Sequence, residues 1–123
     1  MSTHRLRDYL THISQAADRI QAYARDHDQS SFETSELVQD GVIRNIEVIG
    51  EASRRIQSAF PDFAAAHPEL PLAAAYQMRN AVAHDYFAID LGILWSTVRL
   101  DIPLLAETVS ALLRESPDVD RGE

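Results

Sequence analysis

The chain has 123 residues, of which 46% are hydrophobic, and it carries a formal net charge of −8 at pH 7. This length and apolar fraction suffice for one compact domain over residues 1–123 without covalent or metal staples. The absence of cysteine excludes disulfides, thiolate metal sites and a cysteine nucleophile. The acidic balance argues against attraction of the whole molecule to nucleic acid, so any contact with RNA needs a local basic patch.

The N-terminal residues 1–9 are polar, and no apolar stretch long enough for a signal peptide or a membrane span follows them. We therefore expect a soluble, cytoplasmic protein without a membrane partner. All eleven basic residues are arginine. Each arginine can bind a phosphate group through two parallel hydrogen bonds.

Apolar residues at helical spacing predict a first helix from Thr3 to Asp26 and a second from Glu33 to Ser58. The polar stretch His27 to Ser31 interrupts the period and predicts a loop. Gly41 and Gly50 weaken the second helix slightly, but residues this small let neighbouring helices approach closely. The predicted inward-facing residues are Leu6, Leu10, Ile13, Ala17, Ile20 and Ala24 in the first helix and Leu37, Val38, Val42, Ile46, Ile49, Ala52 and Ile56 in the second.

Prolines at both ends of residues 61–71 predict an irregular connection with room for one short helical turn at most. A third helix is predicted from Pro71, at the first helical position, to His84. Asp90 is expected to cap a fourth helix, which Pro103 should kink or split in two. No stretch shows the alternation typical of strands. We therefore predict an all-α, antiparallel bundle of four to five helices.

Candidate chemistry is concentrated between Arg79 and Tyr86. Asn80 lies one helical turn before His84 and could orient its ring. Arg79 and His84 are separated by about 140° around an ideal helix, so they converge only if the helix end loosens or the arginine curls round it. An imidazole that moves a proton and a guanidinium that stabilises phosphate charge suit RNA cleavage by the 2′-hydroxyl. The alternative is structural: Arg79 forms a surface ion pair and His84 caps the helix.

Cleavage of this kind uses both a base and an acid, yet only His84 is well placed. The remaining histidines, His4, His12, His27 and His67, fall in helix flanks or loops, where a solvated side chain needs no function. A two-fold homodimer would bring a second copy of Arg79 and His84 to one cleft. We therefore expect the site to lie between two protomers.

The same residues resemble a known family. The stretch from Met78 to Phe87, together with its flanking segments, resembles the HepT-like branch of the HEPN superfamily over nearly the whole chain and in the same order. Leu72 departs from the pattern, because an aromatic residue is expected after Pro71. The flanking segments are residues 43–52, 67–71, 89–90, 94–95 and 101–105.

The resemblance implies a HEPN-like homodimer that acts as a metal-independent endoribonuclease without cofactors, with Arg79, His84 and Asn80 in its active site. It further implies the toxin of a type II or type VII-like toxin–antitoxin system, partnered by an MNT-type nucleotidyltransferase antitoxin that transfers AMP from ATP to Tyr86. An adenylyl group there would add bulk and a negative charge that competes for Arg79.

Three questions stay open at this point. The antitoxin could silence the nuclease by binding alone, without modifying Tyr86. The chain could instead be a non-catalytic subunit that helps a nucleotidyltransferase bind its substrate or nucleotide, which the acidic charge favours. Finally, Arg44, Glu47 and Glu51 could line the cleft or simply pair with neighbours on their helix.

Overall fold

The structure is a computed structural model that describes residues 3–84 and 89–115. Within these ranges the chain forms helices and short connections, with no strand. The elements are α1 (Thr3–Ala24), α2 (Gln29–Glu33), α3 (Glu36–Ala59), α4 (Pro61–Ala66), α5 (Leu72–His84), α6 (Leu91–Ser96), the π-helical turn η2 (Thr97–Asp101) and α7 (Ile102–Glu115).

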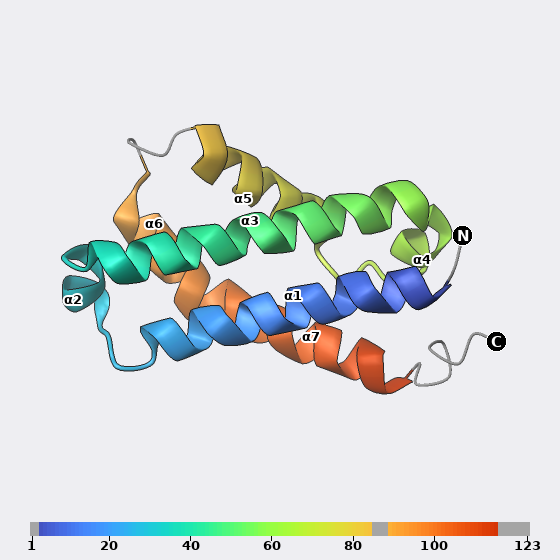
Figure 1. The fold of residues 1–123 in the computed structure, drawn as a ribbon, viewed down its shortest axis with the longest axis horizontal. Coiled ribbons are helices and arrows are strands. Elements are labelled where there is room, and N and C mark those ends of the chain that lie inside the picture. Colours follow the sequence, from blue (N-terminus) through green and yellow to red (C-terminus); the bar gives the residue numbers. More distant parts are fainter. Residues whose placement is uncertain (1–2, 85–88, 116–123) are drawn as a thin grey trace.

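Helix α3 is the centre of an antiparallel bundle (Figure 1). It packs along α1 on one side and along α5 on another, while α7 packs on α1. Successive long helices run in opposite directions, and the short helices α2 and α4 lie at opposite ends of α3 (Figure 1). This confirms the predicted all-α antiparallel bundle. Among the described helices, none is long and apolar enough to cross a membrane.

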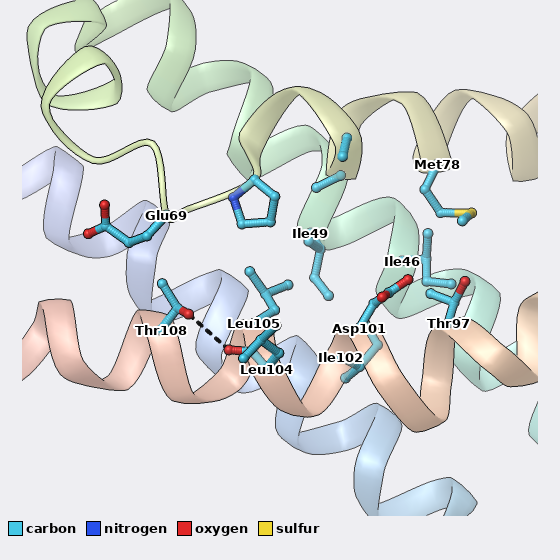
Figure 2. A pocket seen from close by; sticks show the side chains of 13 residues that line it. Ile46, Ile49, Glu69, Met78, Thr97, Asp101, Ile102, Leu104, Leu105 and Thr108 are labelled. Atoms are coloured by element: carbon cyan, nitrogen blue, oxygen red, sulfur yellow. Dashed lines mark hydrogen bonds between the residues drawn. The ribbon is translucent and has the colours of Figure 1, made fainter.

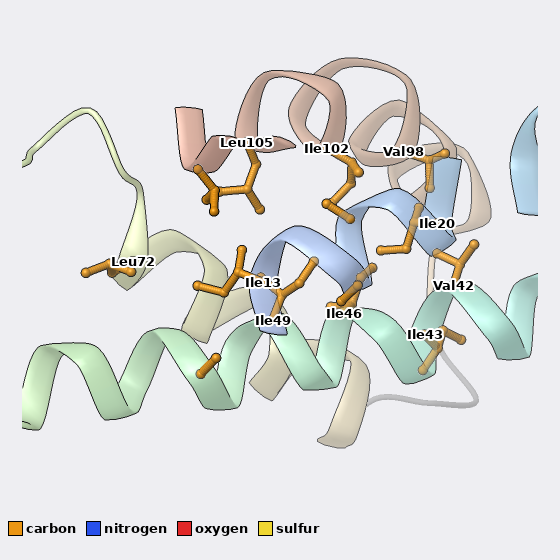
Figure 3. Packing of buried hydrophobic residues seen from close by; sticks show 14 of the residues in the cluster. Ile13, Ile20, Val42, Ile43, Ile46, Ile49, Leu72, Val98, Ile102 and Leu105 are labelled. Atoms are coloured by element: carbon orange, nitrogen blue, oxygen red, sulfur yellow. The ribbon is translucent and has the colours of Figure 1, made fainter. Parts of the chain in front are cut away.

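The core confirms most of the predicted apolar stripes. Ile13 and Ile20 from α1 meet Ile46 and Ile49 from α3 beneath Ile102 and its neighbours in α7 (Figure 3). Fully burying an aliphatic side chain of this kind stabilises a fold by about 1.5–3 kcal/mol. All six residues predicted for α1 are buried, as are five of the seven predicted for α3.

One predicted core residue is wrong. Leu37 is 84% exposed, because it lies about 140° round the helix from Val42 and about 180° from Ile46, away from the buried face. Its sequence neighbour Val38 is partly buried and packs against the core.

The loop predicted from His27 to Ser31 is also wrong, because α2 begins within it. The Ser31 N–H donates to Asp28 Oδ1 at 2.8 Å, and the Asp28 N–H donates to Ser31 Oγ at 3.1 Å, forming a capping box. Phe32 then enters the core, where its ring centroid lies 5.1 Å from that of Trp95. Capping and burial together outweigh the polar composition of this stretch.

The predicted break at Pro103 is confirmed. Proline has no N–H and its ring crowds the carbonyl of the residue four positions earlier. The chain accommodates it with η2, in which the Ile102 N–H donates to the Thr97 carbonyl five residues back. The cap at Asp90 is confirmed too, since its Oδ1 accepts from the N–H groups of Gly92 and Ile93. The third predicted helix begins one residue late, at Leu72.

Candidate active site

Arg79 is placed by an unusually close approach of two helices. A Cβ atom built on Gly50 of α3 would lie 2.1 Å from the Cβ of Arg79 and 2.6 Å from its Cγ. No larger residue fits at such a crossing, so Gly50 lets the backbone of α5 settle onto α3. The expectation that a small residue here serves close packing is confirmed at Gly50.

Asn80 holds the side chain of Arg79. The guanidinium Nη1 donates to Asn80 Oδ1 at 2.9 Å, and both residues are partly buried. The sequence predicted that Asn80 orients His84, whereas its observed partner is Arg79. His84 is the last residue of α5, but its side chain lies outside the described part of the structure, and so does all of Tyr86. The roles predicted for His84 and Tyr86, and any contact of Asn80 with His84, therefore stay predictions.

Arg79 lines a groove of ≈ 470 Å³ between α1, α3 and α5, which we call the polar groove. The positions from α3 recur every three or four residues and so share one face of that helix. Arg44, Glu47 and Glu51 are among them, so they line the cleft as well as offering local partners. The polar groove is lined by Tyr9, His12, Arg44, Glu47, Val48, Glu51, Ala52, Arg55 and Arg79.

Sequence reasoning missed three groove residues. Tyr9 and His12 come from α1, and their rings meet edge to face with centroids 6.4 Å apart. Arg55 comes from the last third of α3. Tyr9 and His12 are three residues apart and share one face of α1, but no sequence signal shows that this face lies beside α5.

The polar groove has a small local excess of positive charge, whereas the chain as a whole is acidic. It holds three arginines against two glutamates. Arg55 Nε lies 3.1 Å from Glu51 Oε2 in an exposed ion pair. Hydrogen bonds with Glu51 and, secondly, with Tyr9 raise the pKa of Arg55 above its usual value, so this guanidinium stays charged.

A second groove, of ≈ 410 Å³, lies on the opposite flank of α5 and is mainly apolar. Figure 2 shows Met78 of α5 above Ile46 and Thr97 at one end of this groove, with Leu104 and Leu105 of α7 farther along it. We call it the apolar groove. Helix α5 thus separates a polar groove from an apolar one.

Two acidic side chains, Glu69 and Asp101, line the otherwise mainly apolar groove. Glu69 Oε2 lies 3.0 Å from His67 Nδ1, and this hydrogen bond lowers the pKa of the Glu69 carboxyl. Within the described ranges, no group of three or more histidine, aspartate or glutamate side chains could hold a metal ion.

The three arginines that line the polar groove of this helical bundle carry guanidinium groups that can bind phosphate through paired hydrogen bonds. Residues 13–112 match the family model described as "Ribonuclease HepT-like". The chain therefore belongs to the HepT-like ribonuclease family, and the expected enzyme class is confirmed at the level of the family.

Individual relatives agree with this assignment. The chain is 39% identical to a Thermococcus cleftensis protein named "Probable ribonuclease HepT" over 99 residues. The matched region covers 80% of this chain and 87% of that protein. This chain is 33% identical over 109 residues, 89% of its length, to 97% of the Methanocaldococcus jannaschii protein named "Putative RNase MJ1380".

A longer relative from the same archaeon is named "Gamma-glutamylcyclotransferase and putative RNase MJ0434". The two proteins are 36% identical over 107 residues, which make up 87% of this chain. This chain spans only 47% of the length of that relative. No solved structure gives a significant match.

Proposed function

We propose that this chain is the toxin of a toxin–antitoxin system and cleaves RNA without a metal ion in the cytoplasm. Family membership supports the ribonuclease activity. The observation that carries the proposal is Arg79, held by Asn80 in an arginine-lined groove on the same helix that ends at His84. A guanidinium fixed in this way can stabilise the charge that develops on a phosphate during cleavage.

In the proposed reaction, His84 removes the proton from an RNA 2′-hydroxyl. The 2′-oxygen then forms a bond to phosphorus while the bond to the 5′-oxygen breaks. A second acid delivers a proton to that leaving oxygen. The products are a 2′,3′-cyclic phosphate end and a 5′-hydroxyl end, and Arg79 neutralises the extra charge on the phosphate oxygens between these states.

Purified wild-type protein is expected to cleave single-stranded RNA in the presence of EDTA, while His84→Ala cleaves about 100-fold more slowly or worse, because it lacks the general base. Gel analysis of end-labelled RNA measures both rates, and the cyclic phosphate identifies the mechanism. Equal cleavage by both proteins would contradict the role of His84. Cleavage by neither would favour the alternative of a non-catalytic subunit for a nucleotidyltransferase.

A homodimer would supply the second acid, and we propose that the apolar groove faces the partner copy. Leu104 lines this groove, and Leu100 lies about one turn before it in the chain; they are 64% and 68% exposed. Contiguous apolar surface of this kind is uncommon on a monomer and typical of an interface. A second copy is the proposed occupant because the reaction needs two proton-transfer groups and the sequence provides one beside Arg79.

Silencing by an MNT-type nucleotidyltransferase antitoxin is the regulatory part of the proposal. Transfer of AMP to Tyr86 forms a phosphodiester from the tyrosine oxygen and releases pyrophosphate from ATP. The added negative charge would compete with RNA for the guanidinium of Arg79.

Toxin isolated after coexpression with an MNT-type nucleotidyltransferase is expected to gain the mass of one or more AMP groups, and Tyr86→Phe is expected to gain none. Intact-mass spectrometry measures this difference directly. Neutralised toxin of unmodified mass would show instead that the antitoxin acts by binding alone.

A further inference from the structure

We infer that the polar groove binds the backbone of single-stranded RNA along one protomer, with Arg44 and Arg55 as phosphate contacts on either side of Arg79. This inference rests on the proposed function and names the form of its substrate. Arg44 and Arg55, which lie outside the segment from Arg79 to Tyr86, would then contribute to the affinity for RNA.

The three arginines lie at different levels along α3. Arg44 and Arg55 lie eleven residues apart on one face of α3, which is about 16 Å along a helix axis. Arg79 crosses α3 at Gly50, because a Cβ there would touch the Cβ of Arg79. Gly50 lies midway between the other two in sequence. Three guanidinium groups at different levels suit a linear chain of phosphates better than a single phosphate or mononucleotide.

The arginines differ in their availability. Arg44 is exposed and has no hydrogen-bond or ion-pair partner among the residues that the structure describes. Arg55 is paired with Glu51 and must exchange this carboxylate for a phosphate. Both members of that pair are solvent-accessible, with side chains 53% and 41% exposed, so the exchange needs no movement of the backbone. Glu51 thus competes with the RNA and keeps binding weak and sensitive to salt.

The opposite wall favours a single strand over a duplex. Tyr9 and His12 present two aromatic rings from α1 to the groove. Unpaired bases expose faces that stack on such rings, whereas bases within an A-form duplex are stacked on each other. The groove therefore combines phosphate contacts from α3 and α5 with stacking surfaces from α1.

The test measures binding of a fluorescent single-stranded 2′-O-methyl oligoribonucleotide, which cannot be cleaved, by anisotropy over a range of salt concentrations. Arg44→Gln and Arg55→Gln are each expected to weaken binding about fivefold near 0.1 M salt and to reduce the salt slope by about 0.7. Glu51→Gln is expected to tighten binding. Arg114→Gln is the control, because Arg114 is exposed on α7, which does not line the groove.

Unchanged affinity and slope in both Arg44→Gln and Arg55→Gln would overturn the inference, as would equal affinity for a 2′-O-methyl duplex. The opposite sign expected for Glu51→Gln separates a groove effect from damage to the fold, since a damaged fold does not bind more tightly. Binding that depends on the groove without any cleavage of ordinary RNA would contradict the proposed ribonuclease and leave this inference standing. Cleavage that persists while groove variants bind normally would contradict this inference alone.

Discussion

Gly50→Ala is expected to destabilise the fold and to slow RNA cleavage together. Alanine improves helix propensity by about 1 kcal/mol. Against this gain, its Cβ would lie 2.1 Å from the Cβ of Arg79 and 3.1 Å from the carbonyl oxygen of Ala75. Neither atom can move by a change of rotamer, so α5 itself must shift. Overpacking of this kind costs about 1–3 kcal/mol and sometimes more, so we expect it to exceed the gain in helix propensity and to lower the free energy of unfolding.

The shift of α5 also moves Arg79 relative to the arginines of α3. A displacement of about 1 Å in a catalytic group can cost a factor of about 100 in rate. Urea unfolding and cleavage of end-labelled RNA measure the two effects, at a temperature where the variant remains folded.

Gly41→Ala is the matched control in the same helix. Its Cβ would approach only the ring of Tyr23, at 3.0 Å, and that side chain is 42% exposed and free to swing outward. This variant should be as stable as wild type or gain up to about 1 kcal/mol from helix propensity. If Gly50→Ala behaved like Gly41→Ala, the close crossing would not position Arg79.

The double variant Leu100→Asp with Leu104→Asp is expected to fold as a monomer and to cleave RNA about 100-fold more slowly. Both leucines are largely exposed in the chain described, so the substitutions cost the isolated fold little. In a dimer, however, they would place unpaired carboxylates in a desolvated interface. Loss of a general acid or base typically costs a factor of about 100 or more. Light scattering gives the mass in solution, and thermal unfolding checks the fold.

Leu37→Asp provides the control for this experiment, because Leu37 is even more exposed and lines neither groove. It should remain dimeric and active. A monomeric double variant with full activity would show that one chain contains both proton-transfer groups. His12, which shares the polar groove with Arg79, would then be the candidate for the second.

The helices could be predicted because each long one buries a continuous apolar stripe, and that stripe is visible in the sequence. The failures occur where this signal is weak. Helix α2 has only five residues and depends on the pair Asp28 and Ser31, a capping pattern that was available in the sequence but lies in a polar stretch. Leu37 lies about 180° round the helix from the buried Ile46, so it is out of phase with the apolar stripe that the prediction assigned it to.

The candidate site divides in the same way. Arg79 and Asn80 could be identified from their spacing to His84 and from the resemblance to the family, but their hydrogen bond to each other was not predicted. Tyr9, His12 and Arg55 could not be, since they join the site only through the packing of α1 and α5 on α3. Periodicity shows which side of a helix is polar, but not which other helix lies beside that polar side.

Helix α5 contacts few other elements of the fold. Within residues 3–84 and 89–115 it packs mainly on α3, and the space between it and α7 is the apolar groove. Anything that fills this groove therefore presses against the helix that carries Arg79. If the proposed dimer forms there, a molecule that binds on the apolar side is expected to change the rate of RNA cleavage without touching RNA.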